Sequence, residues 1–445
     1  MRPILPNELF AAWRLLSIKG TTPNDVSWLS SVAWAAAGLL AAMLLCFIIL
    51  AVRIFAGSRN EKKPDAAPAV PVPPPVKEEK KPEKPERQRF FMLSDIDRRF
   101  GGHETSIEEK PISLAALCEE FRNFSASRLK LYYSIDDIRS FISGMAVSKI
   151  ILMQGMSGTG KTSLAYAFGQ FLQNDSVIIP VQPMWKESGD LVGYYNEFTG
   201  RFNETNMLVT LYRAAYTNDI FIVVLDEINI ARVEYYFAEF LSLLELPDPQ
   251  DRKIRIISDR REGDPVKLVG GEVRLPTNIW FVGTANNDDS TFAISDKVYD
   301  RSMVLNLDRR AELFGAPDTA PIKLSVNAFD RMTQRAMSDY AMTDRNRRRL
   351  RELDDYLVRN FHVTFGNRIM RQIEKFIPVY IACGGREIDA LDDMVSKKVL
   401  RKLESLNPVY VKNAIPGLFD RLDELFGEGE FTRCRDYLRR IEINM

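Results

Sequence analysis

The hydrophobic pattern divides the chain into segments of different character. Residues 32–52 are almost wholly apolar, and no charged residue occurs between Val26 and Val52. As a helix, this run would span about 30 Å, which is the hydrocarbon thickness of a bilayer. About thirty residues precede it, and it is long for the apolar part of a cleaved signal peptide. We therefore expect residues 32–52 to form a single transmembrane helix.

Charges on either side of this run predict its orientation. The N-terminal flank carries only Lys19, whereas the C-terminal flank carries four basic residues: Arg53, Arg59, Lys62 and Lys63. By the positive-inside tendency, residues 1–31 lie outside the cytosol and the remaining chain lies inside it. The expected setting is the inner membrane of a bacterium.

Polar and proline-rich sequence follows the apolar run. Residues 53–89 are dominated by Pro, Lys and Glu, a composition that cannot bury enough apolar surface to fold and that remains extended. We expect a spacer there, and a ligand for a proline-binding domain is the alternative. Residues 90–147 regain helical periodicity, with Leu114, Leu117, Phe121 and Phe124 on one face. These four side chains are expected in the core.

From residue 148 to 315 short apolar runs alternate with helical patterns. Runs at 149–153, 221–225 and 278–283 are apolar without alternation, as in strands that are buried on both faces. This order predicts an α/β fold with a parallel sheet covered on both sides. Residues 316–445 read as a helical lid, with helices at 369–377, ended by Pro378, and at 389–403.

A glycine-rich turn joins the first of these strands to a helix. Residues 155–162 read Gly-Met-Ser-Gly-Thr-Gly-Lys-Thr, the pattern of a phosphate-binding P-loop. Glycines allow successive N–H groups to point at phosphate from a helix N-terminus. Lys161 would reach the β- and γ-phosphates, and the Thr162 hydroxyl would hold Mg²⁺. The predicted nucleotide-binding set is Gly155, Ser157, Gly158, Thr159, Gly160, Lys161, Thr162 and Ser163.

Two acids follow the second strand. Asp226 and Glu227 end the run 221–225, where the carboxyl ends of parallel strands would bring them beside the P-loop. Asp226 is expected to hold Mg²⁺ through water, and Glu227 to act as the general base on the attacking water. The third strand ends in Thr284-Ala285-Asn286.

Together these motifs resemble a known family. The set GMSGTGKT, VVLDEIN, GTANNDD and DKVYDRS is similar to the AAA+ ATPases, and within them to the dynein-related branch that contains McrB and MoxR proteins. The resemblance covers roughly residues 115–440. It implies ATP as the nucleotide, with GTP as an alternative because McrB uses it, and Mg²⁺ as the cofactor.

The resemblance implies roles for further residues. Asn286 occupies the sensor 1 position, which contacts the γ-phosphate or the attacking water. Asp289 matches the acid in the McrB-like Asn-x-x-Asp loop, although Asn287 and Asp288 replace the usual middle pair of that loop. Arg301 matches the arginine finger that a neighbouring subunit supplies, with a salt bridge as the alternative. Arg368 is expected to be sensor 2 in the lid closing over the nucleotide, with Arg371 as its rival. A finger supplied in this way implies a homo-oligomeric ring, most often a hexamer.

Three further segments could contact what the ring acts on. Tyr194 and Tyr195 lie in a stretch that resembles an aromatic-glycine pore loop, although an ordinary packed loop is equally compatible. Residues 255–274 are expected to form an inserted β-hairpin with a turn at Gly270-Gly271. The arginine-rich run 345–351 is flanked by acids, which favours a solvated helix face or a subunit interface over nucleic acid.

Composition narrows the choice of function. Sixty basic and sixty acidic residues cancel, so no overall field attracts nucleic acid. The four cysteines are widely separated and the two histidines isolated, which argues against a disulfide framework and a zinc site. We expect a membrane-anchored ATPase that remodels an unknown protein at the cytosolic face. The alternative is the motor of a McrB-like defence complex that moves DNA for a separate nuclease.

Overall fold

A computed structural model describes Met43 and residues 88–101, 111–259, 261–286, 291–308 and 311–444. The chain divides into two units, Met1–Glu83 and Lys84–Met445, and every element with assigned bounds belongs to the second unit. The predicted segments 1–31, 32–52 and 53–89 lie outside the described residues, apart from Met43 and residues 88 and 89. Within the described part of the chain, no helix is long and apolar enough to cross a membrane.

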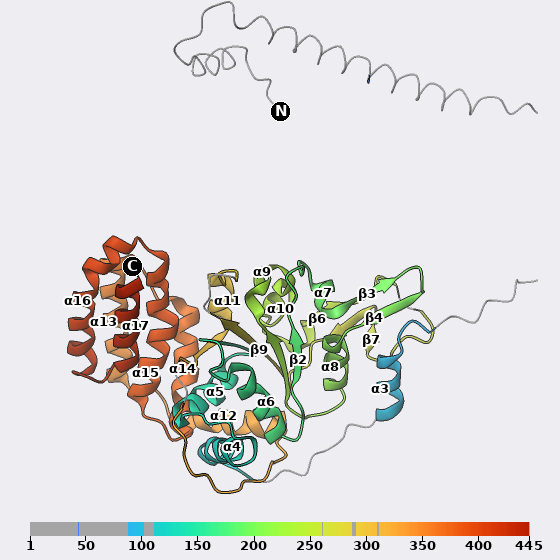
Figure 1. Cartoon of the computed structure of the whole chain (residues 1–445), viewed down its shortest axis with the longest axis horizontal. Coiled ribbons are helices and arrows are strands. Elements are labelled where there is room, and N and C mark those ends of the chain that lie inside the picture. The colour runs from blue at the N-terminus through green and yellow to red at the C-terminus, as the bar shows by residue number, and fades with distance from the viewer. Residues whose placement is uncertain are drawn as a thin grey trace, which may run out of the picture. The chain divides into compact units, whose positions relative to one another are not determined.

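A five-stranded parallel sheet forms the centre of this unit (Figure 1). Its strands are β1 (Ile150–Gly155), β2 (Val177–Pro180), β5 (Phe221–Asp226), β9 (Ile279–Asn286) and β10 (Met303–Asn306). They are ordered β10-β1-β9-β5-β2, so β1 lies between β10 and β9. The predicted α/β fold with a parallel sheet is confirmed.

Helices cover both faces of the sheet because the strands are apolar on both sides. Alternate residues of β1 serve different clusters: Ile151 and Met153 face one, Ile150 and Leu152 the other. The first face carries α4 (Leu114–Leu129), α5 (Ile135–Val147), α6 (Lys161–Phe171) and α12 (Val326–Asp339). The second carries α7 (Ser188–Val192), α8 (Asn206–Ala214), the short helices η1 (Ile228–Ile230), α9 (Val233–Tyr236) and α10 (Ala238–Leu243), and α11 (Asp296–Arg301).

The first face contains two segments that lie outside the predicted α/β region 148–315. The predicted apolar stripe of residues 90–147 is buried in this cluster, as expected; it consists of Leu114, Leu117, Phe121 and Phe124. Helix α12 was included in the predicted lid, but its apolar side chains pack on the sheet together with α4 and α5. By its hydrophobic contacts, α12 belongs to the core.

The C-terminal helices form a lid with its own core, drawn in orange and red in Figure 1. It contains α13 (Asp344–Phe361), α14 (Gly366–Ala382), α15 (Glu387–Met394), α16 (Pro408–Phe426) and α17 (Thr432–Asn444). Pro378 does not end α14 but lies inside it, where tertiary packing of the flanking turns outweighs the lost hydrogen bond. The predicted helix 389–403 is not continuous: after α15 the chain forms a π-helical turn, η3 (Val395–Val399), and a 3₁₀ helix, η4 (Leu400–Ser405).

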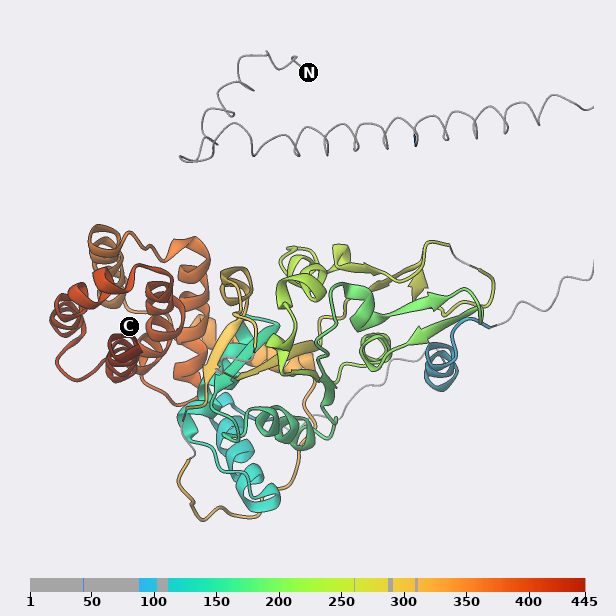
Figure 2. The same cartoon turned by 45° about the horizontal axis from the view of Figure 1, so that its top comes forward.

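Two insertions extend from the end of the core that is remote from the lid (Figure 2). One is the hairpin of β3 (Gly193–Asn196) and β4 (Arg201–Glu204). The other follows the 3₁₀ turn η2 (Pro249–Asp251) and is a small sheet of β6 (Lys253–Arg255), β8 (Glu272–Arg274) and β7 (Leu268–Val269). The predicted turn at Gly270-Gly271 joins β7 to β8, and both glycines have positive φ.

Helix α3 (Met92–Phe100) ties these insertions together. Arg89, just before the helix, pairs with Asp264 of the small sheet insertion, and its carbonyl accepts the N–H of Phe202 in β4. The Glu204 carboxylate accepts the N–H groups of residues 91, 92 and 93, which start the helix and have no intrahelical partner. The segment that leads out of the predicted linker is therefore docked on both insertions.

Candidate active site

The P-loop connects β1 to α6 as predicted, and its glycines are required by its geometry. Gly155 has a φ of 144°, and a Cβ built there would lie 2.3 Å from the main-chain oxygen of Leu307, beyond β10. Gly158 and Gly160 have φ of 75° and 93°, which other residues rarely adopt. The loop thus turns tightly enough to bring the N-terminal N–H groups of α6 to face a phosphate.

Lys161 is folded back on this loop. Its Nζ donates to the carbonyls of Gly155 (3.0 Å) and Met156 (2.8 Å), and the residue is buried. Tyr133 supports the loop from outside, because its hydroxyl donates to the Gly160 carbonyl at 3.1 Å. Burial raises the pKa of Tyr133, so the phenol stays protonated and keeps this donor. Nothing local in the sequence indicated Tyr133.

Oxygen ligands suited to Mg²⁺ meet at the carboxyl ends of β5 and β9. Asp226 Oδ1 accepts hydrogen bonds from the hydroxyls of Thr162 and Thr284, each at 2.7 Å. A hydroxyl and a carboxylate fit Mg²⁺, which prefers oxygen ligands and is usually held by one or two carboxylates and the substrate's phosphates. The structure therefore brings together the two predicted metal ligands, Thr162 and Asp226.

Glu227 adopts an unusual backbone conformation beside this pair. Its φ and ψ are 53° and 51°, in the left-handed region. Three other non-glycine residues in the described part of the chain have positive φ, and all three follow a helix: Lys130, Gln173 and His362. Glu227 instead follows a strand. Its N–H donates to Thr284 Oγ1 at 3.0 Å, and the residue is exposed. Strain of this kind, about 1 kcal/mol or more, is typical of functional sites.

Asn286 lies beside the start of the P-loop. It is the last residue of β9, and its register partner in β1 is Gly155, the first residue of the P-loop. Asp289 lies outside the described residues. Asn229, in η1, holds the chain on both sides of that segment: its Nδ2 donates to the Asn286 carbonyl (3.3 Å) and to Thr291 Oγ1 (2.8 Å). Asn229 lies in the VVLDEIN motif, but it was not singled out from the sequence.

The two predicted arginines meet at one carboxylate. Arg301 at the end of α11 and Arg368 in α14 both form ion pairs with Glu245, at 2.9 and 2.6 Å. The prediction placed Arg368 over the nucleotide of its own subunit, whereas the structure places it beside Arg301. Its rival Arg371 is exposed on the next turn of α14. Glu245 has no motif around it that could have revealed this role.

Arg301 is far from the P-loop of its own chain. Its carbonyl accepts a hydrogen bond from Ser148, which precedes β1, whereas the P-loop follows the other end of that strand. Six residues of strand at about 3.3 Å each separate the two ends by about 20 Å. An arginine side chain cannot span this distance.

The aromatic residues of the β3–β4 hairpin are exposed to different degrees. Tyr194 is 59% exposed and Tyr195 is partly buried, whereas Phe198, in the turn between the strands, is fully exposed. The Asn196 side chain accepts the N–H groups of Phe198 and Thr199 and so fixes this turn. Phe198 was missed because the sequence motif drew attention to the tyrosines instead.

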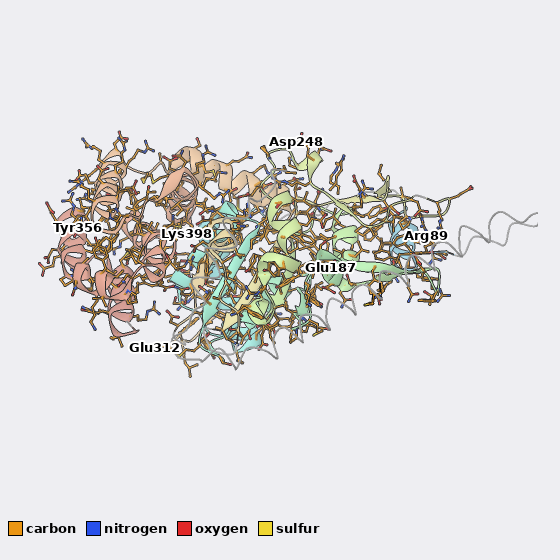
Figure 3. All side chains as sticks on the ribbon, turned by 90° about the horizontal axis from the view of Figure 1, so that it is seen from above. Arg89, Glu187, Asp248, Glu312, Tyr356 and Lys398 are labelled. Atoms are coloured by element: carbon orange, nitrogen blue, oxygen red, sulfur yellow. The ribbon has the colours of Figure 1, made fainter. Side chains whose placement is uncertain are left out.

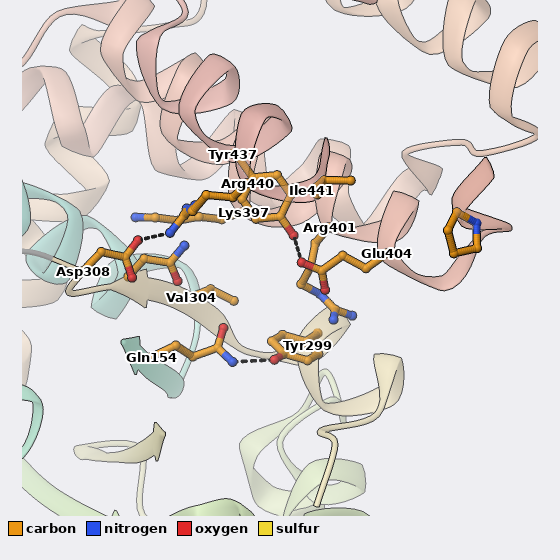
Figure 4. A pocket seen from close by; sticks show the side chains of 12 residues that line it. Gln154, Tyr299, Val304, Asp308, Lys397, Arg401, Glu404, Tyr437, Arg440 and Ile441 are labelled. Atoms are coloured by element: carbon orange, nitrogen blue, oxygen red, sulfur yellow. Dashed lines mark hydrogen bonds and ion pairs between the residues drawn. The ribbon is translucent and has the colours of Figure 1, made fainter. Parts of the chain in front are cut away.

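A cavity of about 470 Å³ lies between the lid and the ends of β1 and β10 (Figure 4). Three pairs of its polar side chains bond to each other: Gln154 donates to Tyr299, Arg440 donates to Asp308, and the Tyr437 hydroxyl donates to Glu404. Gln154 directly precedes Gly155, but no predicted phosphate or metal ligand lines the cavity. We therefore regard it as part of the contact between core and lid.

Comparison with known proteins shows what the core is similar to. Residues 150–302 match the family model described as AAA domain (dynein-related subfamily). No curated protein matches the chain. The chain is similar to a protein from Cytophaga hutchinsonii ATCC 33406 that is provisionally described as an ATPase, with 13% identity, a TM-score of 0.43, and 66% of this chain and 89% of that chain covered. It is also similar to a full-length MCM homolog from Methanopyrus kandleri, with 11% identity, a TM-score of 0.36, and 66% and 63% covered.

Proposed function

We propose that this chain, whose residues 150–302 form an AAA domain of the dynein-related subfamily, assembles into a homo-oligomeric ring that hydrolyses ATP with Mg²⁺ and thereby remodels a protein or protein complex. The observation that carries the ring is the position of Arg301, about 20 Å from its own P-loop. A residue matching the arginine finger at that distance can serve only the nucleotide of a neighbouring copy.

Within one subunit the side chains are arranged for phosphate transfer to water. Lys161 would exchange its bonds to the Gly155 and Met156 carbonyls for bonds to the β- and γ-phosphates. Glu227 would take a proton from water as the water oxygen bonds to the γ-phosphorus and the bond to the β-phosphate oxygen breaks. Asn286 would orient that water from the end of β9. Mg²⁺, held by Thr162 and Asp226, would neutralise charge on the phosphate oxygens.

The neighbouring subunit would supply two arginines. Arg301 and Arg368 share Glu245, so both guanidinium groups belong to one surface and both would meet the same bound nucleotide. Guanidinium groups suit this role because they stay charged and present a rigid set of donors to phosphate oxygens. The assignment of Arg368 to the lid of its own site is replaced in this proposal by a role at the neighbouring site.

The exposed hairpin supports a protein substrate. Phe198 is fully exposed on a turn whose geometry Asn196 fixes, so an apolar ring is held in solvent at the end of the core remote from the lid. An aromatic ring can grip extended polypeptide of varied sequence. The neutral balance of charge gives no corresponding support for DNA. The proposal also includes a membrane anchor and action at the cytosolic face. Both rest only on the apolar run 32–52 and on the charges that flank it.

The proposal predicts that two inactive variants restore each other. Arg301→Ala should retain nucleotide binding, because its P-loop is intact, and should lose about a thousandfold or more in turnover. Glu227→Gln should also be inactive, yet it keeps its arginines. In rings mixed at random from equal amounts, about a quarter of the sites would combine the intact Glu227 of one variant with the intact Arg301 of the other.

Phosphate release from the mixture would measure this effect. Recovery to a substantial fraction of wild-type turnover is expected, and mixtures that stay as inactive as their components would overturn the trans arrangement. The Glu227→Gln ring, stalled with ATP bound and purified from native membranes, also identifies the substrate class by comparison with Lys161→Ala. Enriched protein supports remodelling, whereas enriched DNA with a nuclease subunit would support the defence motor instead.

A further inference from the structure

The helix that ends in Arg301 is held at its C-terminus by side chains from outside it. The last carbonyls of a helix have no partners within the helix. In α11 the Tyr299 carbonyl accepts a hydrogen bond from Lys398. The Asp300 carbonyl accepts one from Gln372 at 3.0 Å, and the Arg301 carbonyl accepts one from Ser148 at 2.8 Å. Two of these three donors, Lys398 and Gln372, belong to the lid.

Lys398 makes the most extensive of these contacts. Its Nζ donates to the carbonyls of Tyr299 at 2.6 Å and Ser302 at 2.5 Å, which lie on either side of Arg301. The residue is 5% exposed and lies at the boundary of lid and core, labelled in Figure 3. A cation at this end of a helix also interacts favourably with the helix dipole. Burial of a lysine is unfavourable unless its amine is paired in this way.

The π-helical turn explains how Lys398 reaches α11. In η3 two consecutive lysines, Lys397 and Lys398, are both buried. Lys397 pairs within the lid with Asp393 at 2.6 Å, and Lys398 points out of the lid to α11. π-Helical turns are rare and frequently occur at functional sites. Here the turn directs one lysine to the lid and the next to the core.

We propose that Lys398 is a positioning residue, which fixes the end of α11 to the lid so that Arg301 is held where the neighbouring nucleotide requires it. This inference rests on the proposed function, because it assumes that Arg301 acts on a neighbouring subunit. Lid and finger helix then move as one body, and a movement of the lid in one subunit displaces the finger in the next site.

Other contacts across the same boundary fit this role. The Arg401 guanidinium lies 3.3 Å from the centre of the Tyr299 ring and pairs with Asp296 at the start of α11. At its other side, Tyr299 accepts a hydrogen bond from Gln154, which directly precedes the P-loop. Helix α11 therefore lies between its own P-loop strand and the lid, and Lys398 holds the end that carries Arg301.

A purely structural role would give a different kinetic result. Lys398→Met removes both hydrogen bonds while keeping the length of the side chain. If Lys398 positions Arg301, the variant keeps its KM for ATP and loses kcat, because ATP binds mainly to the P-loop of its own subunit. A displacement of about 1 Å at a catalytic group can lower the rate by about a hundredfold, so we expect a loss of ten- to a hundredfold. Lys397→Met, in the same π-helical turn, is the matched control, since its amine pairs with Asp393 within the lid.

Mixed rings distinguish the two roles directly. Lys398→Met mixed with Glu227→Gln should regain activity, because the second variant supplies a correctly placed finger. Lys398→Met mixed with Arg301→Ala should regain none, because the finger is defective in both. If Arg301→Ala is restored by Glu227→Gln but Lys398→Met is not, the positioning role is wrong while the proposed function stands.

Gln372→Met provides a second variant if Lys398→Met does not assemble. It removes the single hydrogen bond to the Asp300 carbonyl, so a smaller loss of kcat with the same pattern of recovery is expected. A normal kcat in both assembled variants, or a loss that appears only as a raised KM, would overturn the proposal.

Discussion

The buried ion pair that docks α3 allows a quantitative test of how the N-terminal segment is held. Arg89 and Asp264 form two parallel bonds, Nε to Oδ1 at 3.1 Å and NH2 to Oδ2 at 2.6 Å. Their side chains are 4% and 3% exposed. Asp264→Ala leaves the guanidinium with only the more distant oxygens of Asp259, at 3.1 and 3.4 Å.

An isolated surface pair contributes about 1 kcal/mol or less, whereas removing one partner of a buried pair costs about 3–5 kcal/mol because the other charge is left uncompensated. Because the exposed Asp259 carboxylate would still pair with Arg89 at 3.4 Å, we expect Asp264→Ala to destabilise the docking of α3 by the lower end of this range, about 3 kcal/mol. That loss corresponds to a rise of roughly a hundredfold in the population of the undocked state. Replacing both charges, as in Arg89→Met with Asp264→Leu, should cost much less than either single change.

Amide hydrogen exchange of the full-length chain in detergent would measure this loss. The N–H groups of α3 should exchange about a hundredfold faster in Asp264→Ala, while those of β1 and β9 keep their rates. Arg98→Ala, which breaks an exposed pair with Asp95, is the control and should change little. A rise of less than tenfold, or a double variant no more protected than the single one, would refute the assignment of a buried and strongly coupled pair.

Three further outcomes are expected. Gly155→Ala should abolish ATP binding, measured by fluorescent-nucleotide titration, because its Cβ would meet main chain at 2.3 Å, whereas Gly189→Ala, with open space around it, should bind normally. Thr284→Val should lower kcat by about tenfold through loss of the bonds to Asp226 and to the Glu227 N–H, at an unchanged KM; Thr333→Val, in α12, is the control for a buried hydroxyl. Burial lowers the pKa of Lys398 from its ordinary value of 10.5 to about 7, so between these two pH values the unfolded state binds more protons and the free energy of unfolding should rise with pH. Urea unfolding at several pH values within this range should show a smaller rise in Lys398→Met; equal slopes would contradict the shift.

The sequence predicted the parts of the site whose chemistry is local. The P-loop, Asp226 with Glu227, and Asn286 each lie at the end of an apolar strand, and the parallel sheet brings those ends together. Their spacing along the chain therefore specified both their identity and their meeting place. The family resemblance singled out Arg301, but the sequence could not show that Glu245 is its partner.

Residues that act through tertiary contacts were not predictable in this way. Glu245 and Lys398 have no motif around them, and their roles appear only where the lid meets α11. The π-helical turn was read as part of one continuous helix, because its apolar periodicity differs little from that of an α-helix. The sequence predicted that Pro378 ends its helix, yet the buried turns on both sides of it keep α14 intact.

The single carboxylate shared by Arg301 and Arg368 has a consequence for assembly. Two guanidinium groups and one carboxylate leave one positive charge on this surface in an isolated subunit. In the proposed ring, a neighbour that carries a nucleoside triphosphate would present negative charge to this surface, whereas an empty neighbour would present less. Nucleotide should therefore strengthen the contact between subunits, and by thermodynamic reciprocity each contact should tighten nucleotide binding to the same extent. Because this attraction is electrostatic, added salt should weaken both effects together.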